Sequence, residues 1–223
     1  MVTVTIHQPE FLPWLGFFSK MAMSDIMVLF DCAQYNKQSF QNRNRILHNH
    51  QVRWITVPVM AHKHTTPIKE IRVDNRQGWQ RKVSHIFRET LSEEVNDVVQ
   101  PIWGRPWSFL ADLNIYCLES LREYLGLNTT IVMASSIIKD LNAFSQLNTS
   151  EKNAELVALV GGDRYLSGPH GASYLHPSDF TCKGIRLDTV AWRITSDVQL
   201  SVVSILSNQG KEKTRNAIFT FAS

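Results

Sequence analysis

The chain has 223 residues, 43% of them hydrophobic, and is therefore long enough to bury a substantial core. Its formal net charge of +3 is too small to indicate a nucleic-acid surface, and a mild basic balance fits a phosphorylated small molecule equally well. No apolar run approaches the roughly 18 residues that span a membrane, and the first residues lack the pattern of a signal peptide, so we expect a soluble, cytoplasmic protein without membrane insertion.

The first third of the sequence predicts a strand, a turn, a helix and a second strand. Apolar residues and threonines alternate over residues 2–6, as in a β-strand, and two prolines then end any regular structure. The apolar pattern predicts a helix over Leu15–Ser24 and a buried strand over Ile26–Phe30. A right-handed crossover between these strands places Gln8 and Asp31 at the same carboxyl edge of a parallel sheet.

Strands and helices continue to alternate along the rest of the chain. Asn148 and Glu151 have the spacing of a helix capping box, and Gly126 is a natural helix end. Pro101 and Gly104 break up a tryptophan-containing connector in the middle third. In chain order we predict hairpin strands over 45–47 and 52–57, a strand over 69–73, helices over 78–90 and 109–125, a strand over 129–134, a helix over 148–160, and strands over 164–166 and 184–192.

These elements predict an α/β fold. We expect a mixed, largely parallel sheet with flanking helices and a helical elaboration in the middle third. The length fits one domain over residues 1–215. Residues 216–223 are expected to form a C-terminal tail, because the end of the chain is charged and then weakly apolar.

Polar side chains follow the first two predicted strands. His7 is a candidate general base or phosphate ligand, with a satisfied structural histidine as the alternative. Gln8 can orient a ligand but cannot act as an acid or a base. Asp31 ends a buried strand and needs a partner, so it is either a site residue or part of a structural pair with Arg43 or Arg45.

Arg43 and Arg45 are separated by one residue. In an extended segment they point to the same face, where two guanidinium groups suit a diphosphate or a carboxylate. A solvated strand face is the alternative reading of this spacing. Gln41, Asn42 and Asn44 add amide groups of the kind that bind sugar hydroxyls.

A second polar loop follows the predicted strand 164–166. Ser167 and Gly168 begin a donor-rich segment that can cradle an anion, and His170 is an alternative acid or base. The segment is neither a Walker loop nor a dinucleotide fingerprint, and an ordinary tight turn explains it equally well.

Other reactive side chains predict no metal site and no thiol nucleophile. The pairs His48/His50 and His62/His64 have a chelating spacing but no third ligand, so we read them as loop histidines. Cys32, which follows Asp31, lacks a thiolate-stabilising neighbour and is expected to pack in the core.

Several ordered motifs resemble the WbqC-like family. Residues 6–16 read Ile-x-Gln-Pro-x-x-x-Pro-Trp-x-Gly, residues 31–37 read Asp-x-x-Gln-Tyr-x-Lys, and residues 41–46 read Gln-Asn-Arg-Asn-Arg-Ile. Residues 54–59, 165–169, 174–175 and 200–210 fit the same pattern in order. The resemblance covers nearly the whole chain and implies bacterial surface-polysaccharide and O-antigen synthesis, in settings that handle amino sugars.

The resemblance also guides the choice of site residues. Members usually carry an acidic residue in the C-terminal segment where this chain has Ser204. The resemblance gives no catalytic residue; from their positions at strand ends and in polar loops, the expected catalytic residues are His7, Asp31 and His170. The expected substrate-binding residues are Gln8, Trp14, Gln34, Asn42, Arg43, Arg45, Ser167 and Gly168.

The resulting hypothesis is a transferase that acts on a nucleotide-activated amino sugar. Its partners are this small-molecule substrate and an unidentified acyl or aminoacyl donor, with no nucleic acid, and the sequence identifies no cofactor. In this hypothesis Arg43 and Arg45 hold phosphate, and Gln8 and Asn42 orient the sugar. Two alternatives are a nucleotidyl-transfer enzyme of an α/β nucleotide-binding fold and a non-catalytic subunit that binds sugar nucleotides.

Overall fold

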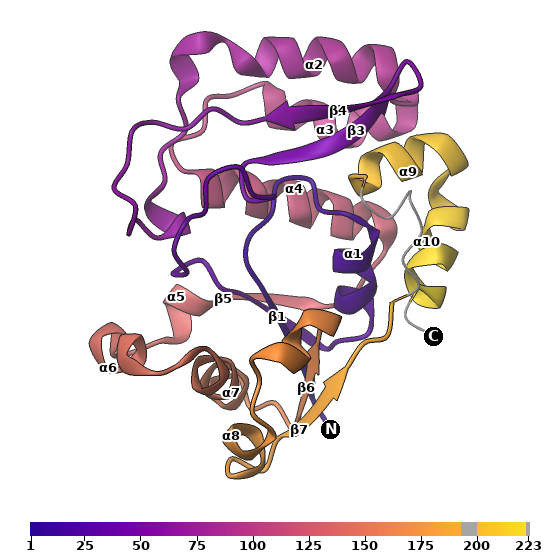
Figure 1. Cartoon of the computed structure of the whole chain (residues 1–223). Coiled ribbons are helices and arrows are strands. Elements are labelled where there is room, and N and C mark those ends of the chain that lie inside the picture. The colour runs from indigo at the N-terminus through magenta and orange to yellow at the C-terminus, as the bar shows by residue number, and fades with distance from the viewer. Residues whose placement is uncertain (193–199, 222–223) are drawn as a thin grey trace.

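A five-stranded β-sheet forms the lower half of the computed structural model, which describes residues 1–192 and 200–221 (Figure 1). From one edge to the other, the sheet consists of β5 (Thr130–Met133), β2 (Ile26–Leu29), β1 (Thr3–His7), β6 (Arg164–Ser167) and β7 (Arg186–Thr189). Every neighbouring pair of these strands is parallel. The predicted α/β class is therefore confirmed.

Strand β1 lies at the centre of the sheet, where the order of strands reverses. The chain leaves β1 for β2 on one side and returns later to β6 on the other side. His7 is in register with Leu29, so Gln8 and Asp31 lie beyond the same carboxyl edge, as predicted. Ligands of open α/β sheets bind at such a reversal point, outside the carboxyl ends of the strands.

Helices surround the sheet and form a separate upper half. The helices of the described ranges are α1 (Leu15–Ala22), α2 (Trp79–Thr90), α3 (Glu93–Trp103), α4 (Leu110–Leu125), α5 (Ala134–Ile137), α6 (Leu141–Gln146), α7 (Thr149–Leu159), α8 (Pro177–Thr181), α9 (Val202–Gln209) and α10 (Lys211–Thr220). Helices α2 to α4 form the predicted elaboration of the middle third (Figure 1). None of the helices in the described part is long and apolar enough to cross a membrane.

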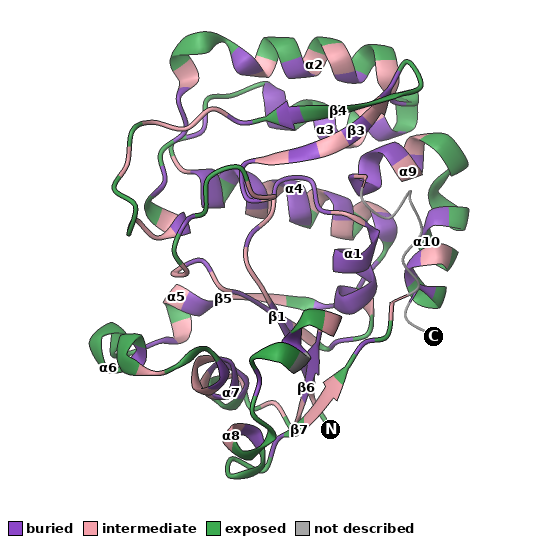
Figure 2. Ribbon diagram, viewed as in Figure 1, coloured by how far each residue is buried: buried purple, intermediate pink, exposed green. Residues whose placement is uncertain are grey.

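Both faces of the sheet are covered by hydrophobic clusters. Val4, Ile6 and Val28 pack in one cluster with residues of α7 and α8. Met27 and Leu29 belong to the other cluster, which includes α1 and the helices of the upper half. Figure 2 shows α1 coloured as buried along nearly its whole length. A charged residue on this helix is therefore placed inside the protein.

A β-hairpin lies beside α2 in the upper half of Figure 1, as the sequence predicts. Strands β3 (Arg43–His48) and β4 (Gln51–Thr56) pair antiparallel. The turn residues Asn49 and His50 have φ of +50° and +60°, the conformation that a two-residue hairpin turn requires. On β3, Asn44 and Ile46 face inward, whereas the intervening arginines lie on the outer face.

The predicted strand over 69–73 is wrong. A short 3₁₀-helix, η1 (Ile68–Glu70), occupies its first part. The amides of Ile68 and Lys69 donate to the carbonyls of Ala33 and Asp31, so this backbone is used to hold the loop that follows β2. Only isolated bridges remain, between Val59 and Val73 and between Arg72 and Phe109.

The predicted connector after the first middle-third helix is also wrong, because α3 runs through Pro101. The proline lies in the last turn, where its missing N–H removes a single helical hydrogen bond. Burial of Val95, Val99 and Ile102 outweighs that loss.

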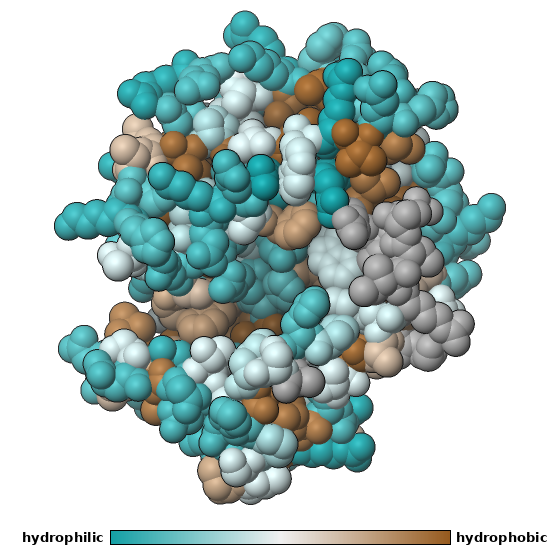
Figure 3. Space-filling view, viewed as in Figure 1, coloured by the Kyte–Doolittle hydropathy of each residue, from teal (hydrophilic) through white to brown (hydrophobic). Residues whose placement is uncertain are grey.

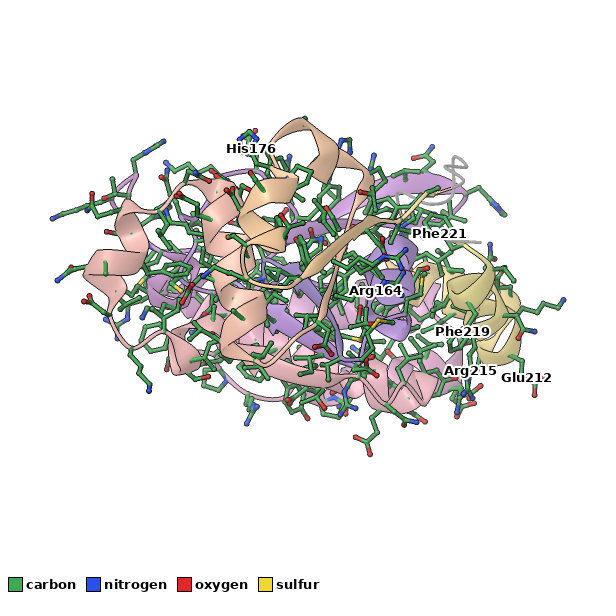
Figure 4. All side chains as sticks on the ribbon, turned by 90° about the horizontal axis from the view of Figure 1, so that it is seen from below. Arg164, His176, Glu212, Arg215, Phe219 and Phe221 are labelled. Carbon is green, nitrogen blue, oxygen red and sulfur yellow. The ribbon has the colours of Figure 1, made fainter. Side chains whose placement is uncertain are left out.

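The expected tail is instead largely helical. Helix α10 crosses the expected boundary at residue 215, and residues 222–223 lie outside the described residues. Ile218 and Phe221 are buried, and α10 packs against α1. The side chains of Glu212, Arg215 and Phe219, labelled in Figure 4, are exposed on this helix. The apolar residues that look weak in sequence thus complete the core around α1.

Candidate functional site

A cavity of about 290 Å³ opens at the carboxyl ends of β1 and β6, where the order of strands reverses. His7 and Gln8 enter it from the end of β1, and residues 168–171 enter from the loop after β6. Helix α1 contributes Lys20, and α7 contributes Asn153. The two polar loops singled out in the sequence therefore meet at one site, which identifies this cavity as the candidate active site.

His7 is held in one tautomer by its own loop. Its Nδ1 lies 3.1 Å from the carbonyl oxygen of Gln8, which can only accept, so Nδ1 carries the proton and Nε2 is left as an acceptor. The ring packs against Phe17, with centroids 4.5 Å apart. Burial, assisted by the positive charge of Lys20, lowers the pKa of His7 from 6.5 to about 3. His7 is therefore neutral near neutral pH and is better suited to accept a hydrogen bond than to hold a proton.

Lys20 and Glu10 form a buried pair of titratable groups next to His7. Lys20 is 4% exposed, and its Nζ donates to the carbonyl of Ile6 at 2.8 Å. Burial lowers the pKa of Lys20 to about 8, although the Glu10 charge opposes the shift. Burial likewise raises the pKa of Glu10 to about 8, against the effect of Lys20. Lys20, which lines the cavity, is thus coupled to a second group that titrates close to neutral pH and lies outside the lining.

Gln8 connects the cavity to the hairpin. Its side-chain oxygen accepts a hydrogen bond from Gln41 Nε2 at 2.6 Å. The backbone carbonyls of Gln41 and Pro9 both accept from Asn114 Nδ2, which ties these two segments to α4. Gln8 is therefore fixed in orientation, with its amide nitrogen left to donate.

The opposite wall of the cavity is formed by α7 and the loop after β6. Asn153 is buried, and Tyr165 stacks on Phe180 with ring centroids 5.3 Å apart. Burial raises the pKa of both Tyr165 and Tyr174, so both phenols stay protonated near neutral pH. His170 lines the same wall, and its imidazole has no hydrogen-bond partner in the described part of the chain.

Trp14 supports the cavity from behind. Its ring meets Trp192, a lining residue, edge to face at 4.8 Å. A Cβ at Gly16 would lie 2.3 Å from the Trp14 ring, so only glycine fits beneath it. The spacing Trp-x-Gly in the first motif is thus a packing requirement.

The outer face of the hairpin carries the predicted pair of arginines. Arg43 and Arg45 lie on this face with the exposed Trp54 of β4, at 4.1 Å and 5.3 Å from its ring centroid. Arg43 also donates to the carbonyl of Gln38. Neither arginine lines the cavity. Figure 3 shows a hollow in the surface between the upper half, which carries the hairpin, and the lower half.

The amides next to these arginines hold the fold together. Asn42 Nδ2 donates to the carbonyl of Val57, and Asn44 Nδ2 donates to the carbonyls of Phe11 and Leu12. Both asparagines are buried and lie outside the cavity. Their present partners are thus backbone groups of the hairpin and of the first loop.

Two further predicted site residues lie away from the cavity. Asp31 accepts from the amide and the hydroxyl of Ser135, and it forms no ion pair with Arg43 or Arg45 among the described residues. The alternative of a structural pair with Arg43 or Arg45 is therefore wrong, because Ser135 at the start of α5 is the residue that bonds to Asp31. Gln34 contacts His64 at 3.0 Å on the exposed surface.

The second polar loop is partly structural. Ser167 is 1% exposed, and its hydroxyl donates to the carbonyl of Gly168. Gly168 itself lines the cavity, and a Cβ there would touch the Trp192 ring at 3.5 Å.

Ser204, at the position where the family resemblance predicts an acidic residue, lies outside the cavity. Its hydroxyl accepts from the amide of Leu47 and so attaches α9 to the hairpin. The serine at this position therefore removes no group from the cavity lining.

Sequence reasoning missed Lys20 and Asn153 as site residues. Lys20 had a detectable signal, because it lies in the apolar helix segment Phe17-Phe18-Ser19-Lys20-Met21. A lysine is rarely buried in such a segment unless a partner or a function requires it. Asn153 had no comparable signal, because a polar residue in an amphipathic helix is ordinary. The described residues contain no cluster of three or more potential metal ligands.

Comparisons with known proteins agree with the motifs. The WbqC-like protein family matches residues 8–216, nearly the whole chain and most of the cavity lining. Uncharacterized protein Rv1507c of Mycobacterium tuberculosis strain H37Rv is 29% identical over 193 residues, which cover 84% of this chain and 81% of that protein. No solved structure matches the chain. The chain belongs to the WbqC-like protein family.

Proposed function

We propose that the protein is a cytoplasmic enzyme of bacterial surface-glycan (O-antigen) biosynthesis. Its substrate is a nucleotide-activated amino sugar, and the reaction transfers an acyl or aminoacyl group to the sugar amine. The observation that carries the proposal is the cavity at the strand-order reversal, where histidine, lysine and amide groups converge. Membership of the WbqC-like family supports the biosynthetic setting.

The cavity supplies groups suited to acyl transfer. The amine nitrogen attacks the carbonyl carbon of the donor, the new N–C bond forms, and the bond to the donor's leaving group breaks. The amine must also lose a proton, and the unpartnered imidazole of His170 is the proposed acceptor. His7 Nε2 accepts a hydrogen bond from the amine, and Gln8 orients the sugar through its fixed amide.

The hairpin face supplies groups for the nucleotide part. A cavity of about 290 Å³ is at the lower limit for a small-molecule site, so a nucleotide sugar must extend beyond it. Gln41 bonds to Gln8 and lies two residues before Arg43, which links the cavity to the hairpin along the chain. In the proposal, Arg43 and Arg45 bind the diphosphate.

The test is a product assay. Nucleotide-linked amino sugars are incubated with acyl-coenzyme A or aminoacyl donors, and acylated sugar is detected by mass spectrometry. The matching sugars with a hydroxyl in place of the amine serve as substrate controls. We expect His170→Asn to lower kcat by about 10²- to 10⁴-fold, whereas the exposed His176→Asn leaves it unchanged.

The other outcomes separate the alternatives. Magnesium-dependent release of pyrophosphate from a nucleoside triphosphate, without acyl transfer, would replace the proposal with nucleotidyl transfer. Binding of the amino sugar without turnover, and activity only after a second protein is added, would assign a non-catalytic sugar-nucleotide-binding role.

A further inference from the structure

The lining of the cavity is rich in hydrogen-bond donors, and its charge near neutral pH is positive. Among the described residues that line it, none is aspartate or glutamate, and Lys20 is the single lysine or arginine. Such a lining disfavours cationic ligands and favours groups that accept hydrogen bonds.

Lys20 is a buried cation whose acidic neighbour, Glu10, acts on it without forming an ion pair in the described part of the chain. Its side chain is 4% exposed, and no ion pair of Lys20 occurs in the part of the chain that the structure describes. An ammonium group carries three N–H donors, and the carbonyl of Ile6 takes one of them. A buried charge of this kind is costly unless something pairs with it.

Asn153 supplies a second, independent observation. Its side chain is 6% exposed and lines the cavity from α7, yet its amide has no hydrogen-bond partner in the described structure. The amide nitrogen of Gln8 is likewise without a partner, because Gln41 bonds to the oxygen of that side chain. A buried amide such as that of Asn153 normally has a partner, so this amide and the partly buried Gln8 amide are available to donate to a ligand.

We propose that this cavity binds the anionic oxygen group, a phosphate or a carboxylate, of a small-molecule ligand. The Lys20 ammonium is its counter-charge, and the amides of Asn153 and Gln8 donate to its oxygens. The inference rests on the proposed function, since it concerns the same cavity, and it adds the charge of the group that enters. The volume of about 290 Å³ admits a sugar-sized or acid-sized group.

The neighbouring titratable groups do not neutralise the positive charge of Lys20 near neutral pH. The groups that share the lining or act on Lys20 are His7, Glu10, Tyr165, His170 and Tyr174. Burial raises the pKa of Glu10 to about 8, so its carboxyl is largely neutral below that pH. As the pH rises through about 8, Lys20 loses its proton and Glu10 ionises, and both changes weaken the binding of an anion.

The experiment is calorimetric titration of the full chain with inorganic phosphate, pyrophosphate and acetate, each alone. Wild type is compared with Lys20→Met, which fills the site with an apolar chain, and with Lys82→Met, which removes one exposed charge elsewhere. We expect Lys20→Met to weaken anion binding about tenfold or more and Lys82→Met to leave it unchanged. His170→Gln should retain the loss of binding above about pH 8.

Equal binding by wild type and Lys20→Met, or no binding of any of the three anions, overturns the inference. If Lys20→Met fails to fold, Asn153→Leu decides in its place: weaker binding supports the inference and unchanged binding overturns it. A response to phosphates alone identifies a phosphorylated ligand, and a response to acetate identifies a carboxylate. Acyl transfer without anion binding rejects this inference only, whereas anion binding without acyl transfer rejects the proposed function only.

Discussion

His7 shows how one side chain couples the site to the stability of the protein. Its side chain is 21% exposed, and burial lowers its pKa from 6.5 to about 3. In the unfolded chain His7 therefore binds a proton below about pH 6.5, whereas in the folded protein it binds that proton only below about pH 3. His7 therefore costs no stability above about pH 6.5 and destabilises the folded protein increasingly as the pH falls toward 3.

We predict that His7→Gln reduces this acid sensitivity. The free energy of unfolding of the variant, relative to wild type, should rise by up to about 1.4 kcal/mol per pH unit as the pH falls from 6.5 toward 3. Urea denaturation of both proteins at several pH values measures the difference in their free energies of unfolding. Glu10 has the opposite pH dependence, but it is present in both proteins, so its contribution cancels in the difference. His176→Gln is the control, because Figure 4 shows His176 at the periphery of the molecule. A parallel pH dependence of His7→Gln and wild type would contradict the prediction.

Arg43 is the residue at which binding and folding can be separated. Its guanidinium lies over Trp54 at the surface, so we expect Arg43→Ala to cost little stability. If the pair binds a diphosphate, the affinity for a nucleotide sugar falls about tenfold or more in calorimetry. Arg53→Ala, an exposed arginine of the same hairpin, should change neither quantity. Unchanged affinity in Arg43→Ala would reject the diphosphate assignment.

At the scale of elements, each helix or strand stabilises the fold through the side chains that it buries. Helix α10 has a weakly apolar sequence, yet Ile218 is fully buried while the adjacent Phe219 is 48% exposed. The helix covers α1, which in turn carries Lys20 into the cavity. A segment that looks like a tail is thus part of the support of the candidate site.

Substitutions in α10 test this assignment. Ile218→Ala should lower the free energy of unfolding by about 2–5 kcal/mol, because it leaves a cavity in the core. Phe219→Ala on the neighbouring position, labelled in Figure 4, should cost less than about 1 kcal/mol. Denaturant unfolding monitored by fluorescence gives both values. Similar small effects of the two variants would indicate that α10 does not pack as described.

At the scale of the whole molecule, two hydrophobic clusters share the strands of one sheet. Val28 belongs to the cluster under α7 and α8, and its neighbours Met27 and Leu29 belong to the other. Because alternate residues of β2 enter different clusters, unfolding either cluster exposes the other. The two halves of the molecule are therefore coupled through the central strands.

This coupling predicts a single cooperative transition. The buried tryptophans Trp79, Trp103 and Trp107 all lie in the cluster that includes the upper half, so fluorescence reports on that cluster. Far-ultraviolet circular dichroism reports on both clusters. We expect the two denaturation curves to coincide, as they do for one cooperative domain. Separate midpoints would show that the clusters unfold independently.

Some features of this protein follow from the sequence alone. A continuous apolar run makes β2 a buried parallel strand, the spacing of Asn148 and Glu151 caps α7, and Gly126 ends α4 with φ of +64°. These are local effects, which propensity and hydrogen bonding within a few residues decide. The alternation of strands and helices then determined the α/β class and brought the loops after β1 and β6 to one edge.

Only the tertiary structure decided which polar residues face the cavity. Asp31 and Asn42 look like ligand-binding residues in sequence, but Ser135 and the carbonyl of Val57 take their hydrogen bonds. Lys20 looks like an ordinary helix residue, yet the packing of α1 between the sheet and α10 buries it beside His7. The physical reason is that a polar side chain's role depends on which groups reach it in space, and contacts between distant segments are not encoded in local spacing.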